Sequence, residues 1–100
     1  MAKIGQQMIG KLVVVRTYGA GVHIGVLRAR VGQVVELENA RRLWRWRGAN
    51  SLSEAATRGV ETAYTRLSEP VPEIVLTQAM EVIPVQEAAR SSLTTSRWGS

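Results

Sequence analysis

Apolar runs of strand length alternate with glycine-containing turns along the first half of the chain. Lys11–Thr17 is the first such run, and its β-branched centre is continuous, as expected of a central strand. Turn residues around Gly19 and Gly21 end it. A second strand is predicted over Val22–Ala29, where Gly25 indicates a bend, a bulge or a close backbone crossing.

The most basic stretch of the chain comes after a third predicted strand, Gln33–Glu38, which follows the turn at Gly32. We expect Asn39-Ala40 to form a tight connection into a further strand over Arg41–Arg47. Successive side chains of a strand point to opposite faces. One face then carries Arg42, Trp44 and Trp46, and the other carries Arg41, Leu43, Arg45 and Arg47. The alternation predicts two neighbouring indoles and an outward ridge of arginines around Leu43.

Helical signals are found in two short segments of the second half. Residues 51–54 (SLSE) match the capping box, in which a serine caps the helix start and a glutamate bonds back to it. This helix is expected to reach about Arg58 and to end at Gly59. Gln86–Leu93 can form one or two further helical turns. Strands are predicted between the two helices, over Thr62–Leu67, Ile74–Leu76 and Met80–Ile83, with a break near Thr77-Gln78.

These elements predict a mainly β domain. We expect a small, partly open SH3-like or Sm-like β-barrel or roll of five to six strands, with one capped short helix and a weak C-terminal helix. The SH3-like or Sm-like analogy rests on the order of β-run, glycine turn, bent strand and short turn over residues 11–43. Residues 1–10 are expected to form an N-terminal arm, residues 11–93 a single domain and residues 94–100 a tail.

Composition narrows the class of protein. With 100 residues, 45% of them hydrophobic, the chain can form one small domain, and oligomerisation would supplement its core. The absence of cysteine excludes disulfides and thiolate sites, and no apolar run approaches the roughly 20 residues that span a bilayer. We therefore expect a cytoplasmic homo-oligomer that does not bind membranes.

Charge is divided unevenly between the two halves. Residues 1–50 hold nine basic and two acidic residues, a net charge of +7, whereas residues 51–100 hold four basic and six acidic residues, a net charge of −2. This asymmetry favours a polyanion as partner of the first half. It equally favours contact between the basic face of one subunit and the acidic face of the next.

The residue inventory gives enzyme chemistry little support. General acid–base or triad catalysis needs His23, the one histidine, beside a nucleophile and an orienting carboxylate. A lone histidine next to a glycine turn is more often a hydrogen-bonded structural residue. With one histidine, no cysteine and no aspartate, the sequence has no metal-ligand cluster of known spacing. We predict no catalytic residue, metal or cofactor.

The arginine and tryptophan stretch is the main candidate binding site. An arginine fork holds a phosphate or carboxylate by two hydrogen bonds, and an indole face stacks on a base. The ligand-binding residues predicted here are Arg41, Arg42, Trp44, Arg45, Trp46 and Arg47. The alternative is that both tryptophans fill the core and the odd-numbered arginines form a solvated face.

The turn Tyr18-Gly19-Ala20-Gly21 is a second candidate, because its backbone amides could receive an anion. In that case Tyr18 and His23 flank the bound group and Arg16 neutralises it. The alternative is a β-turn that needs glycine for a positive φ angle.

Three segments resemble a family of small proteins encoded by bacteriophages and prophages, a family with no assigned biochemical role. They are residues 15–25 (VRTYGAGVHIG), 39–49 (NARRLWRWRGA) and 68–74 (SEPVPEI). The resemblance implies a phage origin without supplying a mechanism. Together with the charge, it leads to the hypothesis of a non-enzymatic phage protein that engages nucleic acid, a nucleotide or an acidic host protein in the host-cell cytoplasm and counters host defence. The alternative is a structural component of the phage particle.

Overall fold

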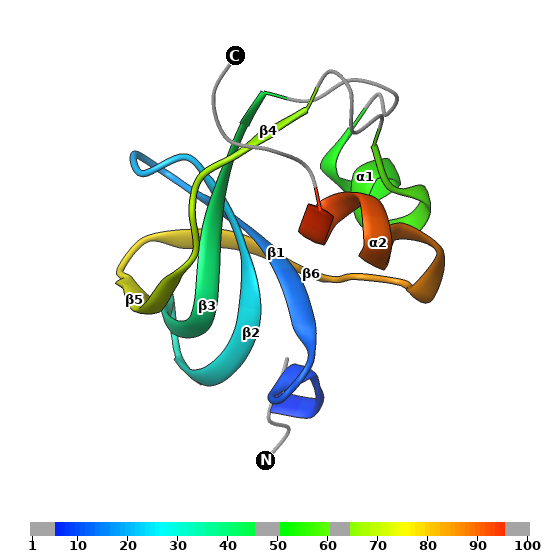
Figure 1. Cartoon of the computed structure of the whole chain (residues 1–100). Coiled ribbons are helices and arrows are strands. Elements are labelled where there is room, and N and C mark those ends of the chain that lie inside the picture. The colour runs from blue at the N-terminus through cyan, green and yellow to red at the C-terminus, as the bar shows by residue number, and fades with distance from the viewer. Residues whose placement is uncertain (1–5, 46–50, 61–64, 96–100) are drawn as a thin grey trace.

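The computed structural model describes residues 6–45, 51–60 and 65–95, apart from the side chains of Trp44, Arg45 and Thr95. Six strands and two α-helices form this part of the chain, preceded by one 3-10 turn (Figure 1). In chain order the elements are η1 (Gln6–Met8), β1 (Leu12–Thr17), β2 (Val22–Val31), β3 (Val34–Arg45), α1 (Leu52–Arg58), β4 (Arg66–Leu67), β5 (Val71–Leu76), β6 (Ala79–Pro84) and α2 (Glu87–Thr95).

The strands form one antiparallel sheet in the order β4-β3-β2-β1-β6, and β5 also pairs with β3. β5 and β6 are separated by residues 77 and 78 alone, although β5 pairs with β3 and β6 pairs with β1, on either side of β2. The sheet therefore has to curl. Two backbone hydrogen bonds of 3.0 Å hold the β5–β6 turn against the other turns, from Ala79 N to Gln33 O and from Tyr18 N to Gln78 O. The predicted mainly β, partly open roll is confirmed.

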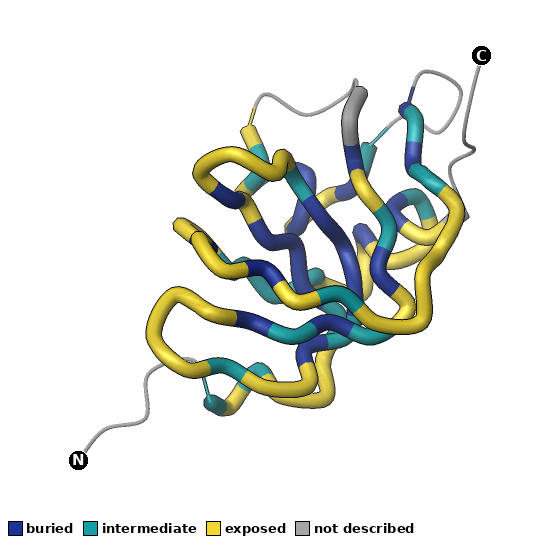
Figure 2. The backbone as a smooth tube through the Cα atoms, turned by 90° about the vertical axis from the view of Figure 1, so that its left-hand side faces the viewer, coloured by how far each residue is buried: buried dark blue, intermediate teal, exposed yellow. Residues whose placement is uncertain are grey.

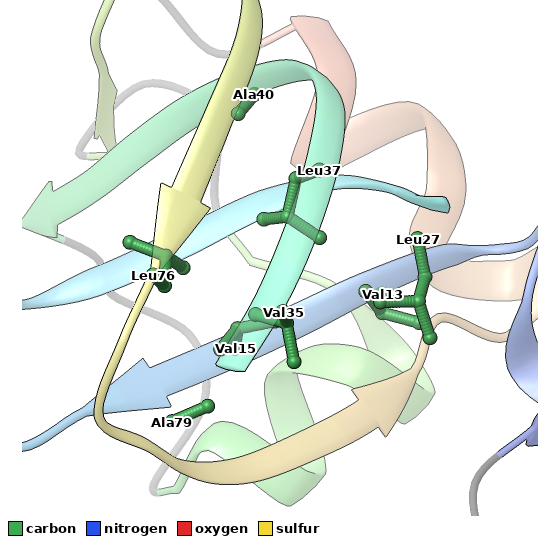
Figure 3. Close-up of a cluster of buried hydrophobic side chains, with 8 residues drawn as sticks. All are labelled: Val13, Val15, Leu27, Val35, Leu37, Ala40, Leu76 and Ala79. Atoms are coloured by element: carbon green, nitrogen blue, oxygen red, sulfur yellow. The ribbon is translucent and has the colours of Figure 1, made fainter. Parts of the chain in front are cut away.

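Apolar side chains on the two faces of the curled sheet make two cores. The interior core consists of Val13, Val15, Leu27, Val35, Leu37, Ala40, Leu76 and Ala79, which Figure 3 shows gathered between the strands. The outer core lies under the two helices and consists of Val14, Ile24, Leu43, Ala56, Leu67, Ala89 and Leu93. Val13, Val14 and Val15 are each 0% exposed, so β1 is buried on both faces, as its apolar run predicts. Figure 2 shows the same alternation of buried strand centres and exposed turns.

The predicted tight connection at Asn39-Ala40 is wrong, because β3 continues through this segment as a strand. Asn39 has a φ angle of 50°, and the β2–β3 register shifts so that Asn39 and Ala40 together lie opposite Gly25. This is a β-bulge. A Cβ atom at Gly25 would lie 3.0 Å from Glu38 O, so of the three features that this glycine indicates, a bend, a bulge or a close backbone crossing, the close crossing is confirmed.

The capped helix predicted after residue 50 is confirmed. Ser51 has an extended backbone, and its Oγ accepts a hydrogen bond from Glu54 N at 3.2 Å. Gly59, with a φ angle of 93°, ends the helix and donates its amide to Ala55 O. The second predicted helix is also present, as α2. α1 and α2 lie side by side over the outer core (Figure 1).

Residues 6–10 fall in the segment predicted to be an N-terminal arm, and they lie against the roll. Gly10 N donates to Leu27 O at 2.7 Å, and Gln6 Nε2 donates to Arg30 O at 3.2 Å. Met8 packs against the interior core. This segment is therefore attached to β2 by both backbone and side-chain contacts.

Candidate anion-binding site

The described members of the predicted ridge, Arg41 and Leu43, do not point outward as strict alternation predicts. Arg41 lies on the helix-covered face, opposite Ile24 in the strand register. Its Nε donates to Ser68 O at 2.6 Å and its Nη1 donates to Thr94 O at 2.7 Å. Leu43, the expected centre of the ridge, is 1% exposed. The prediction that Arg41 points outward is wrong, because α2 covers this face of β3.

Arg42 faces the other way and is exposed. It pairs with His23 across the β2–β3 ladder, and its side chain passes Gly21: a Cβ atom on that glycine would lie 3.8 Å from Arg42 Nε. In the described part of the chain the ion pairs are Arg16–Glu81 and Arg28–Glu38, and no carboxylate pairs with Arg42. Its guanidinium is available to an external anion.

The β1–β2 turn, residues 18–21, lies beside Arg42 and is held by the side chains of Thr17 and His23. Thr17 Oγ1 donates to Gly21 O at 2.7 Å and accepts from Ala20 N at 2.9 Å. Gly21 has a φ angle of 84°, so the predicted need for glycine in this turn is confirmed. Gly19 and Gly21 are exposed, and within residues 6–45, 51–60 and 65–95 their amides donate no hydrogen bond. Such amides can receive an anion.

His23 supports the turn from the interior of the roll. It is 2% exposed, and its Nε2 lies 2.9 Å from Ala20 O. A carbonyl oxygen only accepts, so Nε2 carries the proton. Burial lowers the pKa of His23 and the nearby charge of Arg42 lowers it further, against the hydrogen bond to Ala20, which raises it. The imidazole is therefore neutral at pH 7, and Arg42 supplies the charge at this position.

If the β1–β2 turn is a ligand loop, the sequence predicts that Tyr18 and His23 flank the bound group and that Arg16 neutralises it. The structure does not bring these three side chains together. Arg16 and His23 lie on opposite faces of the sheet. His23 is opposite Val15 in the β1–β2 register, and Arg16, the next residue of β1, points to the other face. Its Nε is 3.1 Å from Glu81 Oε1. Tyr18 is 77% exposed and lines a separate pocket. Of these three side chains, only that of His23 is hydrogen-bonded to the β1–β2 turn, through Ala20 O.

The remaining predicted site residues lie at the end of β3. Arg45 is opposite Arg66 of β4 in the strand register, which places two arginine positions across from each other. The side chains of Trp44 and Arg45, and the whole of Trp46 and Arg47, lie outside the described residues. Their predicted roles in ligand binding remain predictions.

Sequence reasoning missed two features of this end of the roll. The first is the pairing of Arg42 with the exposed β1–β2 turn, which depends on the bulge in β3. The second is the pocket at Tyr18, whose other lining residues are Gln33, Gln78 and Met80. Polar residues at the predicted turns indicate candidate ligand contacts, but the local sequence does not show that turns far apart in the chain lie together.

No described helix has the length and apolar character needed to cross a membrane. The described residues also contain no group of three or more His, Cys, Asp or Glu side chains placed to hold a metal ion.

Comparison with known proteins connects the chain to one family. The model of a domain of unknown function (DUF6948) matches residues 10–93, a range that includes all six described strands and α1. No curated protein and no solved structure matches the chain.

Proposed function

The chain belongs to the DUF6948 family, and we propose that it is a non-enzymatic binding protein that holds a phosphate-bearing ligand at Arg42. The exposed Arg42 guanidinium, with no carboxylate partner in the described part of the chain, is the observation that carries the proposal. The exposed amides of Gly19 and Gly21 add hydrogen-bond donors beside it. Guanidinium forks and backbone amides are both favourable partners of phosphate oxygens.

A compact ligand of the nucleotide class fits this surface better than a long polyanion. Nucleic acids are held by many phosphate contacts along a basic stripe. Near Arg42, Arg41 is bound to two carbonyl groups, and Arg16 is paired with a glutamate. The described arginines therefore do not extend Arg42 into a stripe. We place a nucleotide ahead of nucleic acid and of an acidic host protein as the partner.

The surroundings of His23 support a binding role without catalysis. A general base needs a basic nitrogen that reaches the reacting group. The described Nε2 of His23 is engaged with Ala20 O, and the residue is 2% exposed. His23 thus serves the shape of the turn.

The biological role that we propose rests on the resemblance of residues 15–25, 39–49 and 68–74 to phage proteins. A phage-encoded protein that captures a nucleotide in the host-cell cytoplasm would counter a defence that depends on that nucleotide. Expression of the chain in a defended bacterial host should raise the plating efficiency of a sensitive phage, and Arg42→Gln should abolish the effect. Equal plating with and without the chain would contradict this role.

A structural role in the phage particle is the second candidate, and an uncovered apolar face favours it. Val31, Val34 and Val75 are 78%, 42% and 55% exposed. Val31 lies opposite Val34 in the register, and Val75 lies opposite the neighbouring Glu36, so the three valines share one part of the outer face. A particle component would form large assemblies through such a face without any ligand, which sedimentation at increasing protein concentration would reveal.

The direct test of the proposed function is isothermal titration calorimetry with inorganic pyrophosphate at low salt. Loss of a charge-assisted hydrogen bond costs about 1.5–3 kcal/mol, so Arg42→Gln should weaken binding by about tenfold or more. Arg90→Gln, at an exposed arginine of α2, is the matched control and should bind as the wild type. Equal affinity of Arg42→Gln and wild type would overturn the proposal.

Titration with a duplex oligonucleotide over a salt series distinguishes a nucleic-acid partner from a nucleotide. Each phosphate contact contributes about 0.9 to the slope of log affinity against log salt. A steep slope together with weak pyrophosphate binding would assign the site to nucleic acid in place of a nucleotide.

A further inference from the structure

A pocket of about 310 Å³ lies where three turns of the roll meet. Tyr18 comes from the β1–β2 turn, Gln33 from the β2–β3 turn and Gln78 from the β5–β6 turn, while Met80 belongs to β6. None of these four lining residues is charged. The pocket therefore suits an uncharged group.

Backbone hydrogen bonds fix the three turns to one another. Tyr18 N donates to Gln78 O, and Ala79 N donates to Gln33 O, each at 3.0 Å. Because backbone groups make both contacts, the lining side chains keep their hydrogen-bonding atoms for a ligand. The pocket exists before a ligand arrives, which reduces the ordering cost of binding.

The lining side chains match the chemistry of a flat heteroaromatic ring. Tyr18 is 77% exposed and offers a stacking face. The carboxamides of Gln33 and Gln78 each provide two donors and one acceptor oxygen, as the hydrogen-bonding edge of a base requires. The Met80 thioether is a soft apolar contact for a ring edge. The volume falls at the lower end of the range for small-molecule sites.

We propose that this pocket takes the base of the nucleotide whose phosphate is held at Arg42, an inference that rests on the proposed function. Both parts of the site border the same turn: Tyr18 is its first residue, and Gly21, its last, lies against Arg42. Three Cα–Cα steps of about 3.8 Å separate these ends, so they are at most about 11 Å apart. This spacing of the two backbone positions is compatible with one nucleotide spanning the pocket and Arg42.

A peptide is the competing occupant of a pocket between turns. Proline-rich segments bind grooves lined by several aromatic side chains. Here Tyr18 is the one aromatic residue among the lining residues, and two carboxamides accompany it. This composition favours a base over a peptide.

The test is a titration of ¹⁵N-labelled protein followed by two-dimensional NMR, with adenosine, guanosine, cytidine and uridine as probes of the pocket and ribose 5-phosphate as probe of the phosphate site. At least one nucleoside should shift the side-chain amide signals of Gln33 and Gln78. The matching nucleoside monophosphate should bind about tenfold more tightly than ribose 5-phosphate, as stacking of one base on an aromatic ring provides.

Three variants make the result specific. Tyr18→Ala should remove the preference for the nucleotide over ribose 5-phosphate, and Tyr18→Phe should retain it because the ring remains. Tyr18 is exposed, so neither change disturbs the core. Thr77→Ala is the control: this exposed residue belongs to the same β5–β6 turn but does not line the pocket, and its loss should change nothing.

The outcomes separate the pocket from the phosphate site. If ribose 5-phosphate shifts Gly21 but no nucleoside shifts Gln33 or Gln78, the base pocket is overturned and the proposed function stands. If a nucleoside shifts the glutamines but ribose 5-phosphate shifts nothing, the pocket stands and the phosphate site fails. If a proline-rich peptide shifts the glutamines and no nucleoside does, the pocket is a peptide site and the inference is overturned.

Discussion

Gly25 sets how closely β2 crosses the bulged part of β3. An added Cβ atom would lie 3.0 Å from Glu38 O and 3.2 Å from Ala40 Cα, both backbone atoms that cannot rotate away. Gly25→Ala should therefore lower the free energy of unfolding by about 1–3 kcal/mol, as overpacking does. Urea unfolding measures this. Gly19→Ala is the control, since nothing lies within 4 Å of the added atom, and equal stability of the two variants would contradict the close crossing.

His23 gives the stability a defined dependence on pH. Burial, followed by the charge of Arg42, lowers its pKa below 6.5 in the folded chain, so the unfolded chain binds a proton more readily. The stabilisation from neutral His23 is complete above the unfolded pKa of about 6.5 and is lost as pH falls below it. His23→Gln, whose amide can still donate to Ala20 O, should flatten this part of the pH profile of unfolding.

NMR titration of the His23 ring provides the matching measurement. Arg42→Gln should raise the pKa of His23, because it removes a nearby positive charge. A wild-type His23 pKa at or above 6.5 would contradict the burial of this residue. An unchanged pKa in Arg42→Gln would contradict its closeness to Arg42.

At the scale of single residues, the sequence predicts which side chains share a face of a strand better than it predicts what lies against each face. It placed Arg41 and Leu43 on one face of β3 and Arg42 on the other, as the register has them. Which face solvent reaches could not be predicted, because that depends on where α2 lies. The proposed binding role therefore falls to Arg42, which the alternation places on the same face as the two tryptophans.

Arg41 joins three elements. From β3 it donates to Ser68 O, between β4 and β5, and to Thr94 O in the last turn of α2. A cation at a helix C-terminus is also favourable to the helix dipole. Arg41→Met should lower the free energy of unfolding by about 1.5–3 kcal/mol and leave pyrophosphate binding unchanged. Lost binding with unchanged stability would return Arg41 to the ligand site.

At the scale of elements, the N-cap of α1 also stabilises the fold. Ser51 Oγ accepts the Glu54 amide, so Ser51→Ala should cost about 0.5–2 kcal/mol in chemical unfolding. Ser53→Ala, at an exposed residue of the first turn whose hydroxyl is not part of the cap, should be close to neutral. A neutral Ser51→Ala would place the start of the helix elsewhere.

Elements with local signals were predictable, and those that depend on distant contacts were not. The cap at Ser51 and the stop at Gly59 act within one helix, so the sequence located α1 well. The sequence also predicts the break at residues 77 and 78, but it does not predict that this break joins a strand paired with β3 to a strand paired with β1. The sequence predicts a turn at Asn39 where the structure has a bulge, because asparagine with a positive φ angle suits both.

At the scale of the whole molecule, the described part of the chain brings a basic residue of the first half against an acidic residue of the second half. Arg16 of the basic half pairs with Glu81 of the acidic half, and Arg28 pairs with Glu38 of its own half. The Arg16–Glu81 pair therefore offsets one unit of the net charge of +7 in residues 1–50, a sum that already includes Glu38. Among the described residues, Arg42 is the exposed arginine beside the β1–β2 turn that has no carboxylate partner, which suits a compact ligand.

NMR detection of the arginine side chains tests most directly whether Arg42 holds the phosphate. With the four nucleoside monophosphates titrated in turn, the Nε–Hε signal of Arg42 and the amide of Gly21 should shift together with a single dissociation constant, while the Nε–Hε signals of Arg58 and Arg90 on the helices stay fixed. Shifts confined to Arg58 or Arg90, or none at Arg42 and Gly21 with any of the four, would contradict the account.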